Sequence, residues 1–187
     1  MKFLLKIKHW QLFTLLFIPV LTADFVTIST HASGDYFSFR VFAAMLLLFV
    51  GVFFSWLYAL ATGLQQKLPP TVSMNITRFK IALFIPSAYI TLIIADMFGA
   101  PLGATNGLTA SALAVIIPLH LLSMAGIFYC IYFNAKSLKA TELQRPVVFA
   151  DYLGEIFIIW FFPIGIWAVQ PRINALFGVS STNPMLL

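Results

Sequence analysis

The sequence predicts an all-α membrane protein, a single integral membrane domain over residues 1–187 with about five transmembrane helices. Apolar residues make up 61% of the chain and charged residues only 9%, whereas a soluble domain has roughly 25% charged residues. The apolar residues form long stretches, and a bilayer core of ~30 Å needs ~20 of them in one helix. Positive charges cluster between these stretches, which is typical of membrane topology. We therefore expect a lipid bilayer as the surroundings and no nucleic-acid partner.

Five stretches have the length and composition of a membrane helix. We expect these helices at about residues 10–28, 41–62, 81–98, 111–133 and 153–169. The prolines of Lys67–Pro70 end the second helix, because proline lacks an amide donor. Asn75 is suited to cap the start of the third. The lysines before the first stretch also resemble those of a signal peptide, but Leu21 fits a cleavage site poorly, so we expect a retained helix.

The fifth stretch allows two interpretations. Its unbroken apolar part runs only from Ile156 to Val169, and Pro163 and Gly165 inside it favour a kink or a turn. A spanning helix remains possible if it begins near Val147. A re-entrant segment would instead return the chain to the side from which it came.

The basic residues predict the orientation of the chain. Of the 11 lysine and arginine residues, all except Arg40 and Arg172 fall on one side of the expected helices. Because cytoplasmic loops carry the excess of positive charge, we expect a cytoplasmic N-terminus. With five spans, the C-terminus and Arg172 lie on the opposite side. Pro171 then ends the fifth helix, and Gln170, Arg172 and Asn174 mark its end.

The second helix carries small residues at successive i, i+4 positions: Gly51, Ser55, Ala59 and Gly63. They form a shallow groove along one face, which allows another backbone to approach closely. This pattern predicts a helix-packing face. It is occupied either by another part of the same chain or by another subunit.

Polar residues inside the expected helices suggest a second feature. Asp24 and Asp96 lie ~21 and ~22 Å along their helices from the cytoplasmic side, and Arg40 and His120 approach the same leaflet. Because charge in the hydrocarbon region is costly, we hypothesise an outer-leaflet polar cluster of Asp24, Arg40, Asp96 and His120. In the alternative, each acid lies near the headgroups or pairs once with an arginine.

The acids near the fourth and fifth helices have a simpler interpretation. Asp151 and Glu155 lie near a helix N-terminus, which favours negative charge. We expect Thr141, Glu142 and the neighbouring lysines to form a solvated cytoplasmic face.

No motif of an enzyme is found. The chain has no His-Glu-x-x-His zinc motif, no Gly-x-Ser-x-Gly elbow and no glycine loop for phosphate. We therefore predict no catalytic residue, no metal ligand and no cofactor.

Two stretches carry a resemblance. They are 7–13 (IKHWQLF) and 154–174 (GEIFIIWFFPIGIWAVQPRIN). Together they resemble a group of small multi-helix bacterial inner-membrane proteins for which no activity is known. The resemblance implies a multi-pass protein of a bacterial inner membrane and carries over no catalytic residue.

These observations favour a non-catalytic integral membrane protein, a subunit or accessory component of a membrane assembly. Its partner would be another membrane protein or a second copy of the chain. The alternative is a small proton or cation channel or transporter that uses the intramembrane acids.

Overall fold

The computed structural model describes residues 2–30, 36–98 and 110–178, and in this part of the chain all regular secondary structure is helical. Its helices are η1 (Lys2–Leu5), α1 (His9–Thr30), α2 (Tyr36–Gln65), α3 (Ile76–Met97), α4 (Ala110–Leu143), α5 (Phe149–Trp160) and α6 (Phe162–Leu176). Helices α1 to α4 each contain a stretch long and apolar enough to cross a membrane. The predicted all-α class is confirmed for the described residues, and four of the five expected membrane helices have the length and composition to cross a bilayer.

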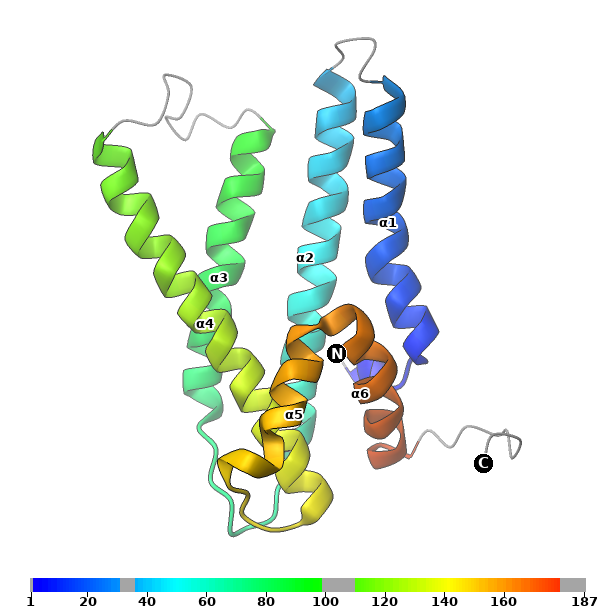
Figure 1. Ribbon diagram of the computed structural model, residues 1–187, viewed down its shortest axis with the longest axis vertical. Coiled ribbons are helices and arrows are strands. Elements are labelled where there is room, and N and C mark those ends of the chain that lie inside the picture. Colours follow the sequence, from blue (N-terminus) through cyan, green and yellow to red (C-terminus); the bar gives the residue numbers. More distant parts are fainter. Residues whose placement is uncertain (1, 31–35, 99–109, 179–187) are drawn as a thin grey trace.

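The helices form two antiparallel pairs with a hairpin at one end (Figure 1). Helix α1 lies beside α2, and α3 packs on α4. The upper halves of α3 and α4 diverge, whereas their lower halves pack together. The short helices α5 and α6 fold back against the lower end, where α5 packs on α4 and α6 packs on α1 and η1. This end, at the start of α1, is called the hairpin end below.

Local sequence signals set several helix boundaries. Helix α2 ends at Gln65, directly before the predicted break at Lys67–Pro70. The side-chain oxygen of Asn75 accepts a hydrogen bond from the backbone N–H of Arg78 at 3.0 Å. Asn75 therefore caps α3, as predicted.

The fifth stretch is two helices, which corrects the expectation of one helix over 153–169. Phe161 separates α5 from α6 with a non-helical backbone (φ −82°, ψ 55°). Pro163 lies at the start of α6, where its missing N–H costs no helical hydrogen bond. A Cβ added at Gly165 would collide with the carbonyl oxygen of Ile158. The two residues that favoured a turn in the sequence therefore allow the reversal.

The core lies at the hairpin end, around the second half of α2. Trp56, Leu57, Leu60 and Leu64 of α2 are almost fully buried. The extension of α4 past residue 133 packs into this core, so the expectation of a solvated face there is wrong. Asn134, Ser137 and Thr141 of this extension are buried. The side-chain amide of Asn134 donates to the backbone carbonyl of Leu57 on α2 at 3.4 Å.

Candidate functional site

Four charged residues meet at the hairpin end and form what we call the ionic cluster: Lys139, Glu142, Glu155 and Arg172. The Arg172 guanidinium donates to both carboxylate oxygens of Glu142, at 2.7 and 2.6 Å. It also donates to Oε1 of Glu155 at 2.9 Å, and the Lys139 ammonium donates to the same oxygen at 3.1 Å. The cluster thus joins α4, α5 and α6.

Both carboxylates in the cluster are held by cations. Burial raises the pKa of Glu155, but the hydrogen bonds from Arg172 and Lys139 outweigh it, so this pKa lies below the ordinary glutamate value. The hydrogen bond to Glu142 raises the pKa of Arg172 further above its ordinary value, against the effect of burial. Each charged group in the cluster therefore has a partner of opposite charge. The ionised cluster holds α5 and α6 to α4.

The structure corrects the placement of Arg172. With a spanning fifth helix, Arg172 would lie at the opposite end of the molecule from Glu142, yet the two residues hydrogen-bond. The chain reverses at Phe161 and carries Arg172 back to the end of α4. Glu155 was expected only to favour a helix N-terminus, and Glu142 to lie on a solvated face. Both instead bind Arg172. The helix-breaking Pro163 between Glu155 and Arg172 was the available signal that these two charges could meet.

A second polar centre is Gln170, which is fully buried. Its side-chain oxygen accepts a hydrogen bond from the indole N–H of Trp56 at 3.0 Å. Its amide nitrogen donates to the backbone carbonyls of Leu4 and Ile7 at 2.9 and 3.0 Å. Asn174 adds a hydrogen bond to the carbonyl of Ile7 at 3.2 Å. Gln170 therefore connects α6 to α2 and to the residues before α1.

The two stretches that carry the resemblance contact each other. The ring of His9 packs on that of Trp167 with 4.6 Å between centroids, and Phe13 lies 5.9 Å from the same indole. With the bonds from Gln170 to Ile7, these contacts join the beginning of α1 to α6. These two stretches therefore form one structural unit.

The predicted helix-packing face of α2 is partly filled by the same chain. Ala59 is almost fully buried, and a Cβ at Gly63 would lie 2.6 Å from Leu5 Cδ1 and 3.0 Å from Phe177 Cζ. Ser55 is half-buried, whereas Gly51 is exposed, and no atom of the described chain lies within 4 Å of a Cβ built there. The face is thus internal at the hairpin end and open farther along α2.

The described residues give little support to the hypothesis of an outer-leaflet polar cluster. Asp24 and Arg40 are both exposed, and no ion pair joins these two described side chains. The side chain of Asp96 lies outside the described part of the structure. His120 is exposed on α4, and its Nδ1 lies 3.3 Å from the hydroxyl of Tyr89 on α3.

The described residues offer no group of three His, Cys, Asp or Glu side chains that could hold a metal ion. The carboxylates of the ionic cluster are occupied by Lys139 and Arg172. These ion pairs connect α4, α5 and α6. No protein-family model, curated protein or solved structure matches this chain.

Proposed function

We propose that this chain is a non-catalytic integral membrane protein that serves as a subunit or accessory component of a membrane assembly. The observation that carries the proposal is the exposed imidazole of His120 within the apolar stretch Leu113–Leu143 of α4. Polar side chains at membrane depth normally face other protein segments, because lipid cannot satisfy them. A helix from a partner protein would cover His120 and the exposed residues beside it.

The surroundings of His120 support this interpretation. Val115, Ile117 and Leu121 are 66%, 53% and 61% exposed, so more than one side of α4 is uncovered here. In Figure 1 this half of α4 stands apart from α2 and diverges from α3. The opposite half of α4 is packed against α2, α3 and α5. A partner would therefore bind at the end away from the hairpin.

We also propose the topology and location of the protein. The N-terminus is cytoplasmic, because every lysine and arginine except Arg40 belongs to the hairpin end once Arg172 is included. Helices α5 and α6 have 12 and 15 residues, which is shorter than a bilayer core requires. They form a re-entrant or interfacial hairpin on the cytoplasmic side. The resemblance favours a bacterial inner membrane.

The test is extraction of the protein from its native membrane in a mild detergent, followed by native mass spectrometry. We expect a second protein in a fixed ratio, and we expect His120→Leu to reduce its yield strongly. Tyr89→Phe is the matched control, because it removes the hydrogen bond to His120 but keeps the imidazole. A chain recovered alone, or a partner retained equally by His120→Leu, would contradict the proposal.

The second candidate is a proton or cation channel or transporter. The pairing of two titratable side chains, Tyr89 and His120, within membrane-capable helices favours it. Proton flux into liposomes containing the purified protein would support this function if His120→Leu and Asp96→Asn abolished it. Equal flux in protein-free liposomes would exclude it.

A further inference from the structure

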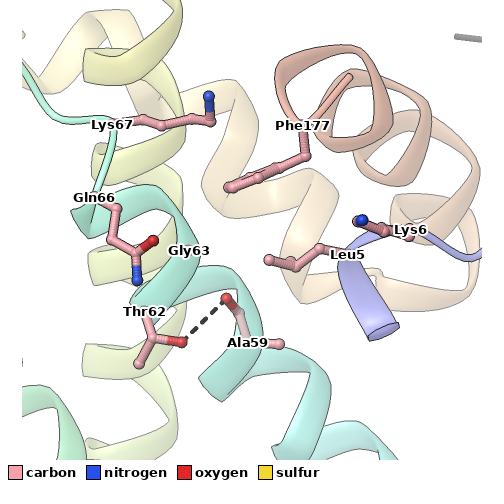
Figure 2. Close-up of a pocket in the computed structure, with 8 residues that line it drawn as sticks. All are labelled: Leu5, Lys6, Ala59, Thr62, Gly63, Gln66, Lys67 and Phe177. Carbon is pink, nitrogen blue, oxygen red and sulfur yellow. Dashed lines mark hydrogen bonds between the residues drawn. The ribbon is translucent and has the colours of Figure 1, made fainter. Parts of the chain in front are cut away.

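A pocket of about 400 Å³ lies at the hairpin end, between α2 and two segments from opposite ends of the described chain. Figure 2 shows Leu5 of η1 and Phe177, which follows α6, pointing toward α2 near Gly63. These side chains and Ala59 form the apolar part of the lining. The pocket exists because α6 returns to the hairpin end, so the sequence alone did not indicate it.

The polar part of the lining is basic. Lys6 and Lys67 are exposed, and Gln66 lies beside Lys67. The ammonium of Lys67 lies 5.1 Å from the ring centre of Phe177, which places it next to the apolar lining. The pocket lining contains no acidic residue. It therefore combines two positive charges with an apolar surface.

The charges of Lys6 and Lys67 are not neutralised within the described part of the protein. The three acids of the hairpin end bind other cations: Glu142 binds Arg172, Glu155 binds Arg172 and Lys139, and Asp151 binds Arg145. Neither pocket lysine forms an ion pair with a described carboxylate. Both ammonium groups are exposed at the mouth of the pocket and can bind an anion from outside the chain.

The position of the pocket relative to the apolar stretches indicates which kind of anion could bind there. The apolar stretch of α2 ends at Gln65 and that of α1 begins at His9. Lys6 and Lys67 thus lie just beyond the apolar stretches, at the level of phospholipid headgroups, whereas Ala59 lies within the stretch of α2. Farther along α2, the half-buried Ser55 and the exposed Gly51 leave the small-residue face open. A ligand that fits both parts has a negative head and a hydrocarbon chain.

We propose that this pocket binds an anionic phospholipid, with its phosphate between Lys6 and Lys67 and one acyl chain running from the apolar lining toward the open part of the small-residue face at Gly51. Basic pockets between membrane helices recognise anionic headgroups in this way. A volume of about 400 Å³ is also within the usual range for small-molecule sites. The inference requires insertion in a membrane but does not depend on the partner assembly proposed above.

The test uses the full-length protein, delipidated in detergent and titrated with phosphatidylglycerol or phosphatidylcholine, with bound lipids counted by native mass spectrometry. We expect phosphatidylglycerol to bind at least about tenfold more tightly, and each of Lys6→Gln and Lys67→Gln to weaken it about fivefold. Lys80→Gln is the matched control, because this exposed lysine of α3 does not line the pocket. It should leave the affinity unchanged.

A further variant tests the hydrocarbon chain. Gly51→Phe keeps both lysines and places a ring on the open part of the face, where no described atom lies within 4 Å of the Cβ position, so we expect weaker binding of phosphatidylglycerol with little change in thermal stability. Equal binding of both lipids, or wild-type affinity in both lysine variants, would overturn the proposal. Displacement of the lipid by millimolar inorganic phosphate would also overturn it, since it would show a site for a free anion.

Discussion

The indole N–H of Trp56 and the side-chain oxygen of Gln170 form a buried hydrogen bond of 3.0 Å between α2 and α6. Both residues are fully buried. The same Gln170 side chain donates to the backbone before α1. One amide therefore holds three parts of the chain together, and it does so because α6 returns to the hairpin end.

Replacement of Gln170 by leucine should destabilise the protein. Gln170→Leu leaves the Trp56 N–H and the carbonyls of Leu4 and Ile7 without this partner in a buried site. We expect the free energy of unfolding to fall by about 2–4 kcal/mol, since a buried group without a partner costs about 1–3 kcal/mol. Unfolding in mixed micelles with increasing SDS measures this change. Gln66→Leu, at an exposed position just after α2, should have little effect; equal losses in both variants would contradict the assignment.

Two arginine substitutions should differ in their cost. Arg172→Met removes three hydrogen bonds and leaves Glu142 without this partner, so we expect a loss of about 2–3 kcal/mol. Arg145→Met breaks the ion pair with Asp151, but the Arg145 side chain is 54% exposed. Its loss should stay below about 1 kcal/mol. The same SDS titration compares them, and a larger loss in Arg145→Met would show that the ionic cluster is not the stronger clamp.

Acid should weaken the hairpin through Glu155. Its pKa is lowered in the folded protein, so its ionised form contributes stability above the ordinary value of 4.5, and this contribution is lost as the pH falls through the lowered pKa. We expect the Tm of the wild type to fall below about pH 4.5, and that of Glu155→Gln to start lower and change less. Because the pKa of Asp151 is also lowered, Asp151→Asn is needed as a control. An unchanged pH profile in Glu155→Gln would refute this role.

Two helical glycines should respond oppositely to alanine. A Cβ at Gly126 would lie 2.6 Å from the backbone oxygen of Ala82, so Gly126→Ala forces α3 and α4 apart. We expect a loss of about 1–3 kcal/mol. Gly154 has no described atom within 4 Å of its Cβ position, and Gly154→Ala should raise stability by up to about 1 kcal/mol. Thermal unfolding in detergent measures both, and a neutral Gly126→Ala would show that the helices can separate without cost.

Much of the architecture could be predicted because it depends on local chemistry. The apolar stretches identify four helices that can cross a membrane, since lipid requires every spanning segment to satisfy its own backbone. Asn75 and the prolines after Lys67 set helix boundaries through their own side chains. Of the small residues of α2, Ala59 is buried and Gly63 packs closely against Leu5 and Phe177 of the same chain.

The sequence by itself determined the helical class, the approximate positions of its four long helices and the run of small residues on α2, but not where α2 and α3 begin or where α4 ends. Only the tertiary structure decided what the fifth stretch does. Pro163 and Gly165 allowed a reversal but did not require it, and the direction of α6 after Phe161 depends on packing against α1 and η1. That direction brings Arg172 to Glu142 and creates the pocket beside Gly63, because partners so distant in sequence meet only when the whole chain packs.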